Sequence, residues 1–479
     1  MRFFAKPGLF VATALMLLAV TPAQSAPACP DKVPLPLVAD GIPLDDEPCP
    51  DGVRGLKSFA HMAWQTFKML VGPASMATGS RGESDKAREI TAMSGPRVFE
   101  TYKSDWEILP VLAAKQQDWG TYPSEAAVCK GYTPAKPGRL PDGSLVLASL
   151  NKFANVTQPD TPGAPPGVGH LLIAQNDSLV RYLAAFNENA FNLIKNLDQS
   201  VNFDASEHDP IEGKTKADDG TITIKSAWIE IKDSKPDPSK IYHRSAWVQD
   251  PSTGECREAT VGLVGLHIVH KTKSSQQWVW ASFEHVQNAP LRGEPPTGFT
   301  FNDGSGAAMP PFAPANTQIT PTSPWVVPPP YNVERLHEIA PAIQTVNGIW
   351  QQAFQGSVWS NYQLVVVQWP ELAQSRPPTT LFGDKGVRPA PPCGVLYPHA
   401  NMANTVMETF LQPTGALDCP TDEINLVTTC MGCHYQAHNY DFIWAIPLNN
   451  NSSPDAGVAS RIRQSALSTL RKITGGSPR

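Results

Sequence analysis

Two stretches of the chain carry apolar residues three or four positions apart, the spacing of a helix that buries one face. The first runs from Gly55 to Val71, and its apolar face consists of Phe59, Met62, Ala63, Phe67 and Leu70. The second runs from Ser178 to Leu197, with a broader apolar face of Leu179, Tyr182, Leu183, Phe186 and Phe191. The pattern predicts two core helices, to which we assign no chemistry.

Beyond Thr221 the period of the pattern changes to two, which is typical of strands. A strand is expected first, in which the apolar positions are Ile222, Ile224, Ala227, Ile229 and Ile231. The segments Val261–Thr272 and Gln277–Val286 follow, separated by a short polar turn, and they predict a long hairpin. Farther along, a helix is expected over Ile339–Gln355 and a strand over Trp359–Trp369.

The expected hairpin places three ionisable side chains. With the turn centred on residues 273–276, His267 and Glu284 are near-diagonal neighbours on one face, and His270 lies on the other. A register slip of one residue would exchange the faces. Half-buried structural roles are expected for the histidines of this region, and His267 with Glu284 is its candidate for a second functional site.

Proline-rich stretches separate these elements. Residues 132–145 and 158–168 predict surface loops, and residues 376–392 are another such run. The expected fold class is α+β, a β-rich N-terminal body with core helices followed by a smaller, mainly helical C-terminal region. The boundaries that we expect are 1–25 for a signal peptide, 26–300 for the body, 301–333 for a Pro-rich connection and 334–479 for the C-terminal region.

The N-terminus has the pattern of a secretory signal. Arg2 and Lys6 precede the apolar run Leu9–Val20, and small residues follow, with cleavage expected after Ser25 or Ala26. No later stretch approaches the roughly 20 apolar residues that a membrane-spanning helix needs. The sequence therefore predicts a periplasmic protein without a transmembrane segment.

Composition narrows the classes of partner. Removing the signal, which carries Arg2 and Lys6, takes the formal net charge from −6 to −8, and no basic stripe remains to bind nucleic acid. The chain has 479 residues and 48 prolines, about twice average usage, which favours long irregular connections and a β-rich architecture.

Cys430-Met431-Gly432-Cys433-His434 has the spacing of a c-type haem attachment site. Two thiols separated by two residues lie on one side of a helical turn, where they can form thioethers with the vinyl groups of one haem, and the histidine is the proximal iron ligand. Two alternatives fit the chain less well. A structural zinc site needs four ligands, and a second cysteine pair of comparable spacing is missing from the sequence. A thioredoxin-like dithiol follows the first strand of a βαβ unit, whereas this motif lies near the C-terminus. The motif therefore predicts one covalent haem c, attached through Cys430 and Cys433 with His434 on the iron.

The remaining cysteines are even in number, which favours disulfides in an oxidising compartment. They are Cys29, Cys49, Cys129, Cys256, Cys393 and Cys419. Three disulfides are expected, and Cys29 with Cys49 and Cys393 with Cys419 would close short loops, although the sequence leaves the pairing open.

The ligand on the opposite side of the iron must come from upstream of the motif. The 45 residues after the motif contain no methionine and a single histidine, His438. On a continuing helix His438 would lie on the same side of the haem as His434. Thr405 and Glu408 have capping-box spacing and predict a short helix, whose first turn holds Met407. Met407 is one candidate ligand, with core packing as its competing role, and Met402 is another. If neither binds, the site is open.

Two function classes follow from these options. The first is a mono-haem electron-transfer protein with a periplasmic redox partner. The alternative is a haem-dependent oxidoreductase, peroxidase-like or oxygenase-like, with an open distal site and a small-molecule substrate. Electron transfer needs only a small domain, so the large body favours a further task, whereas a single haem limits multi-electron chemistry. Whether the chain is an enzyme stays open at this stage.

Several short motifs together resemble a known family. They are Trp64-Gln65-Thr66-Phe67, the run Trp280–His285, Asn361-Tyr362 with Gln368-Trp369-Pro370, Asn404-Thr405 with Glu408-Thr409, and the late Cys-Met-Gly-Cys-His. This combination is similar to the large exported single-haem proteins called the cytochrome c family in proteobacteria. The resemblance implies export and haem c, and it implies no particular substrate.

Overall fold

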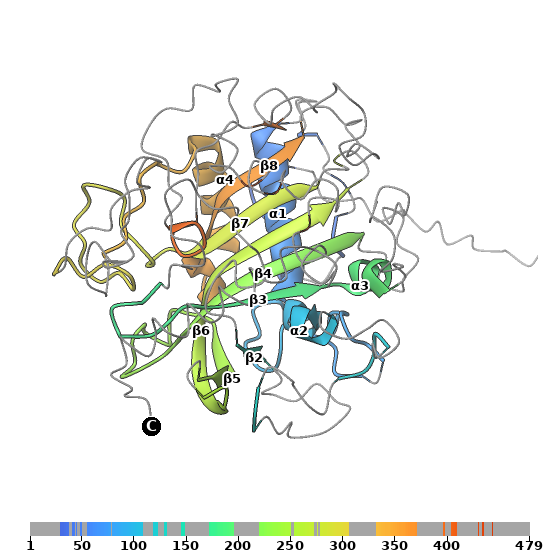
Figure 1. Cartoon of the computed structure of the whole chain (residues 1–479). Coiled ribbons are helices and arrows are strands. Elements are labelled where there is room, and N and C mark those ends of the chain that lie inside the picture. The colour runs from blue at the N-terminus through green and yellow to red at the C-terminus, as the bar shows by residue number, and fades with distance from the viewer. Residues whose placement is uncertain are drawn as a thin grey trace, which may run out of the picture.

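One curled sheet organises the part of the chain that the computed structural model describes (Figure 1). The described residues are 29–37, 41–43, 45, 48–49, 55–77, 79–108, 118–122, 129–131, 145–148, 172–195, 220–250, 253–272, 275, 278–305, 332–370, 396–397, 404–409, 430, 434 and 443. The strands are β1 (Lys103–Ser104), β2 (Val146–Leu147), β3 (Arg181–Phe186), β4 (Thr221–Glu230), β5 (His243–Gln249), β6 (Cys256–Lys271), β7 (Val279–His285), β8 (Tyr362–Pro370) and β9 (Leu396–Tyr397). The helices are α1 (Leu56–Leu70), α2 (Asp105–Ile108), α3 (Glu188–Lys195) and α4 (Pro341–Ala353), with 3-10 turns η1 (Val98–Thr101) and η4 (Val358–Asn361).

The main path through the sheet is antiparallel, in the order β1-β3-β4-β6-β7-β8-β9. Strand β6 is long enough to pair with β4 along one edge and with β5 and then β7 along the other. Strand β2 adds in parallel to β5. The described core is thus a β-rich α+β body whose sheet curls into half a barrel, which confirms this part of the predicted fold class.

One face of the sheet packs on α1 and α4, which cross behind the strands in Figure 1. Buried side chains at this face include Leu183, Ile224, Leu266, Ile268 and Phe283 from the sheet, with Phe59, Trp64, Phe67, Val346 and Trp350 from the helices. The indole N–H of Trp64 donates to Oδ1 of Asn347 at 2.9 Å, and the Asn347 amide donates to the Leu364 carbonyl at 2.9 Å. Both helices are therefore anchored to β8 by one buried amide.

The expected helix over Ser178–Leu197 is wrong in its first half. Residues Arg181–Phe186 form β3, an inner strand between β1 and β4, and helix α3 begins only at Glu188. Five of the six β3 residues are buried, so the strand is apolar on both faces and lacks the alternation that marks a half-exposed strand. A short apolar run of this kind cannot be told from a helix by periodicity.

The other predicted elements with described residues are confirmed. They are α1, β4, the β6–β7 hairpin, α4 within Ile339–Gln355, and β8, which begins at Tyr362 because Val358–Asn361 forms a 3-10 turn. The signal peptide, the proline-rich stretches 158–168 and 376–392, and residues 132–144 lie outside the described residues.

Two disulfides join described cysteines. Cys29 pairs with Cys49, as the sequence suggested, and Cys129 pairs with Cys256 at the start of β6. Cys393 and Cys419 lie outside the described residues. Disulfides form and persist in oxidising compartments, so these two favour an extracytoplasmic location. In the described part of the chain, no helix has the length and apolar character to cross a membrane.

Candidate functional site

Of the haem motif, His434 lies against the face of the sheet opposite α1 and α4, whereas Cys430 packs against the apolar clusters of both faces. We call the face opposite α1 and α4 the turn face, because the turn 404–409 covers part of it. Cys430 and His434 are both helical and half-buried. The imidazole of His434 lies 4.3 Å from the indole of Trp280 in β7, measured between ring centroids, with 49° between their planes. Cys433, the third predicted site residue, lies outside the described residues, as do Met402 and His438.

Trp280 belongs to a row of paired residues that crosses the turn face. The register pairs Phe186 with Thr223, Thr223 with Val269, and Val269 with Trp280. Around this row lies a buried apolar cluster of Ile108, Phe186, Ala190, Phe191, Val269, Trp278, Trp280 and Ile443, against which Cys430 packs. The described surface beside His434 is therefore apolar and aromatic, the kind of lining that sites for flat organic cofactors have.

The next row on the same face is less buried. It consists of Ala184, Lys225, His267 and Ser282. The first three are half-buried, whereas Ser282 is buried. Nε2 of His267 lies 3.4 Å from Oε1 of Glu408, and both side chains keep some solvent exposure. The middle of the face therefore presents an imidazole paired with a carboxylate.

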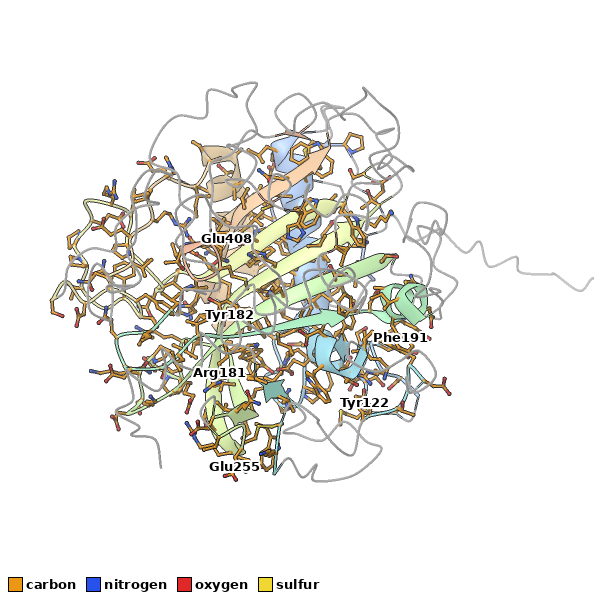
Figure 2. The ribbon with its side chains drawn as sticks, viewed as in Figure 1. Tyr122, Arg181, Tyr182, Phe191, Glu255 and Glu408 are labelled. Atoms are coloured by element: carbon orange, nitrogen blue, oxygen red, sulfur yellow. A yellow bond between two sulfur atoms is a disulfide. The ribbon has the colours of Figure 1, made fainter. Side chains whose placement is uncertain are left out.

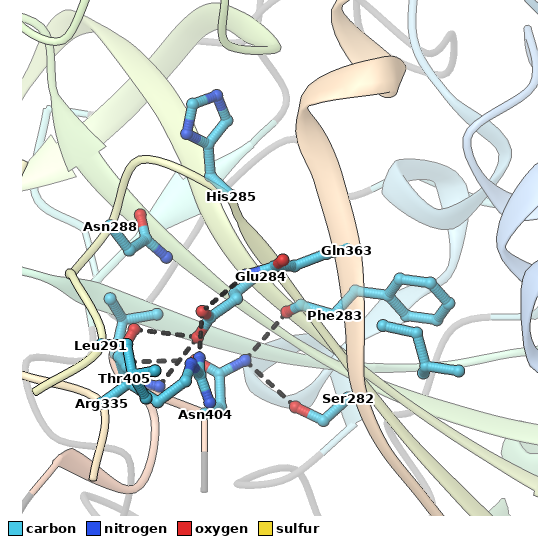
Figure 3. Close-up of polar contacts among 12 residues, drawn as sticks. Ser282, Phe283, Glu284, His285, Asn288, Leu291, Arg335, Gln363, Asn404 and Thr405 are labelled. Atoms are coloured by element: carbon cyan, nitrogen blue, oxygen red, sulfur yellow. Dashed lines mark hydrogen bonds and ion pairs between the residues drawn. The ribbon is translucent and has the colours of Figure 1, made fainter. Parts of the chain in front are cut away.

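The third row, Tyr182, Ala227, Gly265 and Glu284, is covered by the turn 404–409. Glu284 is almost fully buried and forms an ion pair with Arg335. Its Oε2 accepts hydrogen bonds from the backbone N–H and the hydroxyl of Thr405 at 2.9 and 2.8 Å, as Figure 3 shows. The amide of Asn404 donates to Phe283 O at 2.8 Å and to Ser282 Oγ at 3.0 Å. These bonds hold the turn on the sheet.

The predicted capping box of Thr405 and Glu408 does not form, and residues 404–409 are a turn rather than the expected short helix. Oδ1 of Asn404 accepts the backbone N–H of Val406 at 3.0 Å, and Oε2 of Glu408 accepts the backbone N–H of Asn404 at 2.9 Å. Thr405, the cap that we expected, binds Glu284 instead. Asn404 thus takes the cap position because the buried carboxylate below the turn competes for Thr405.

Met407 lies in the core between the turn and the sheet. It is 4 % exposed and belongs to the same apolar cluster as Tyr182, Ala227 and Val406. The hydroxyl of Tyr182, which is labelled in Figure 2, donates to Val406 O at 2.7 Å. This packing is that of a core methionine, the competing role considered for it above.

Two other histidines have structural roles. His285 donates from Nε2 to the Lys240 carbonyl at 3.0 Å, and its Nδ1 accepts the backbone N–H of Gln287 at 3.2 Å. Burial lowers the pKa of His285 to about 4. On α1, Nδ1 of His61 accepts the indole N–H of Trp350 at 3.1 Å, and burial lowers the pKa of His61 to about 4. Both rings are therefore neutral at pH 7.

The predicted pair of His267 and Glu284 shares a face, as the hairpin register required, but each residue has its own acidic or basic partner. Glu284 pairs with Arg335, and His267 lies beside Glu408. Glu408, Arg335 and Trp280 were not singled out as site residues from the sequence, because their proximity depends on long-range packing. In the described part of the chain, no group of three or more His, Cys, Asp or Glu side chains could hold a metal ion.

No protein-family model, curated protein sequence or solved structure matches this chain. Function is therefore inferred from the motif and from the geometry of the turn face.

Proposed function

We propose that this chain is a periplasmic mono-haem c-type cytochrome with a redox function, which exchanges electrons with a periplasmic partner. Cys430 and Cys433 would attach the haem, and His434 would bind its iron. In this proposal the segment around Cys430 and His434 carries the haem, and the sheet, to which β8 and α4 of the predicted C-terminal region also belong, is the surface beside it. The resemblance to large exported single-haem proteins supports the same assignment.

The observation that carries the proposal is the contact between His434 and Trp280. The motif alone predicts haem attachment. The position of His434 and Cys430 beside the buried apolar row of Phe186, Val269 and Trp280 adds a surface that suits a porphyrin. The two disulfides agree with the compartment in which haem c is attached.

The chain's own residues would have three tasks. The paired thiols retain the cofactor, His434 supplies an imidazole nitrogen to the iron, and the apolar row excludes water from one side of the ring. When bound, the haem supplies a one-electron couple, whose potential depends on the axial ligands and on burial.

A haem-dependent oxidoreductase with an open distal site is the second candidate. The half-buried pair of His267 and Glu408 favours it, because an imidazole beside a carboxylate can exchange protons with a bound small-molecule substrate. The coordination of the iron separates the two candidates, since an enzyme of this kind needs an open or exchangeable position.

The test is covalent attachment. The full chain, exported in a host that matures c-type cytochromes, should retain haem stain on a denaturing gel. The double variant Cys430→Ala/Cys433→Ala should lose the stain. The matched control is Cys129→Ala/Cys256→Ala, which removes two cysteines of a disulfide and should keep the stain. Stain that persists without Cys430 and Cys433, or its absence from wild type, would sink the proposal.

A further inference from the structure

Trp280 is fixed in the middle of the sheet. Its strand β7 lies between β6 and β8, and the register pairs Trp280 with Val269 on one side and with Gln368 on the other. Every residue of β7 is buried, and Trp280 itself is 3 % exposed. A side chain held in a close-packed core can move only if its neighbours move with it. Trp280 is therefore a rigid part of the turn face.

Two residues of the haem motif contact this rigid part of the sheet. The imidazole of His434 lies 4.3 Å from the indole of Trp280, measured between ring centroids. Cys430 packs against the buried apolar cluster to which Phe186, Val269 and Trp280 belong. A flexible segment that carries a metal ligand places it less precisely than a strand does. The contact with β7 therefore gives His434 a fixed surface that the motif itself does not supply.

The ring contact limits how far the imidazole can turn. The torsion about the bond between Cβ and Cγ of a histidine is broad in the absence of contacts. In this structure the two ring planes meet at 49°, so a large rotation of the His434 ring either collides with the indole of Trp280 or breaks the contact. Residues that orient a metal-bound histidine tune the properties of the metal. An indole packed on the imidazole is suited to this task.

We propose that Trp280 is the positioning residue of His434: its indole fixes the plane of the imidazole that binds the iron and excludes water beside it. This inference rests on the proposed attachment of haem at Cys430 and Cys433. Hydration stabilises the more highly charged ferric form, and burial is one of the properties by which a protein sets the potential of a haem. Trp280 therefore raises the reduction potential of the site.

The experiment compares full-length holoproteins. Proton NMR of the ferric protein gives shifted haem methyl signals, whose spread depends on the orientation of the axial imidazole plane. Trp280→Ala removes the ring, and it should redistribute these signals and lower the reduction potential. Trp280→Phe keeps a flat ring beside the imidazole and should leave both close to wild type. Val269→Ala is the matched control, because it opens space in the same cluster but keeps the indole, and its methyl pattern should be that of wild type.

The outcomes separate this inference from the proposed function. A pyridine haemochrome assay measures covalent haem independently of the orientation of the imidazole. A Trp280→Ala protein with covalent haem and the wild-type methyl pattern overturns the role of Trp280 and leaves the proposed function in place. Equal redistribution in Val269→Ala also overturns it, because the effect then comes from the cavity. Trp280→Leu, which fills more of the space without a flat ring, replaces Trp280→Ala if that variant does not fold. Absence of covalent haem from wild type overturns both proposals.

Discussion

Gly265 lies directly beneath Val406: a Cβ placed on Gly265 would stand 2.8 Å from Cγ2 of Val406, closer than real Cβ atoms approach a neighbour. The same Cβ would lie 3.4 Å from the Met407 methyl carbon and 3.5 Å from Nδ2 of Asn404. The turn 404–409 therefore contacts the sheet at Gly265, the one position without a side chain in the row of Tyr182, Ala227, Gly265 and Glu284. This contact places Glu408, a residue of the turn, beside His267.

Gly265→Ala should destabilise the protein by about 1–3 kcal/mol, because the added methyl group overpacks the seat of the turn. Urea denaturation of the holoprotein measures the loss. The matched control is Gly348→Ala in α4, where an added Cβ meets nothing within 4 Å. That substitution should stabilise by about 0.5–1 kcal/mol, since alanine is the better helix former. Equal effects of the two substitutions would contradict the seating of the turn on Gly265.

The Glu284–Arg335 ion pair, which lies beneath the turn 404–409, should be the costliest contact of this region to break. Both side chains are buried, so Glu284→Gln leaves the Arg335 guanidinium without its counter-charge, at a cost of about 3–5 kcal/mol. Arg292→Ala breaks the half-exposed pair with Glu334 and should cost at most about 1 kcal/mol.

The double variant Glu284→Gln/Arg335→Met should recover part of the loss, because it removes both charges. Free energies of unfolding for the four proteins are compared at one pH and salt concentration. A Glu284→Gln variant as stable as Arg292→Ala would contradict the account.

Acid should destabilise the fold through the two buried histidines. Burial lowers the pKa of His61 and of His285 from 6.5 to about 4. The unfolded chain therefore binds more protons than the folded one between these values. The stabilising contribution of each histidine is complete above pH 6.5 and is lost as the pH falls toward 4. Between pH 7 and pH 5 the loss is about 2 kcal/mol for each histidine.

His61→Asn should reduce this pH dependence, because it removes one titrating group and keeps an acceptor for the Trp350 indole N–H. The difference in unfolding free energy between pH 7 and pH 5 should become smaller by about 2 kcal/mol than in wild type. His243→Asn changes an exposed histidine of β5 and is the matched control. An unchanged difference in His61→Asn would show that His61 is not the source.

Local patterns were sufficient for most of the fold and for part of the site. The period of apolar residues located α1, β4 and the β6–β7 hairpin, and the pairing of β6 with β7 placed His267 and Glu284 on one face. The pattern did not predict β3 as a strand, because β3 is buried on both faces and lacks the alternation of apolar and polar residues. The sequence also did not predict that Arg335 pairs with Glu284 or that Glu408 lies beside His267. Both contacts join segments that are far apart in the chain, and a local pattern carries no information on them.

Met407 has two competing roles, core packing and iron ligation, and the two predict opposite results in one experiment. As a buried core residue it should tolerate Met407→Leu, which conserves volume and should cost less than about 1.5 kcal/mol. Met407→Ala should cost about 2–5 kcal/mol through the cavity that it leaves. Neither substitution should change the ferric spin state, since the sulfur lies under the turn. Leucine cannot bind iron, so a high-spin Met407→Leu protein that is still stably folded would make Met407 the ligand. Met62→Leu, at a buried methionine of α1, is the control for the effect of the exchange itself.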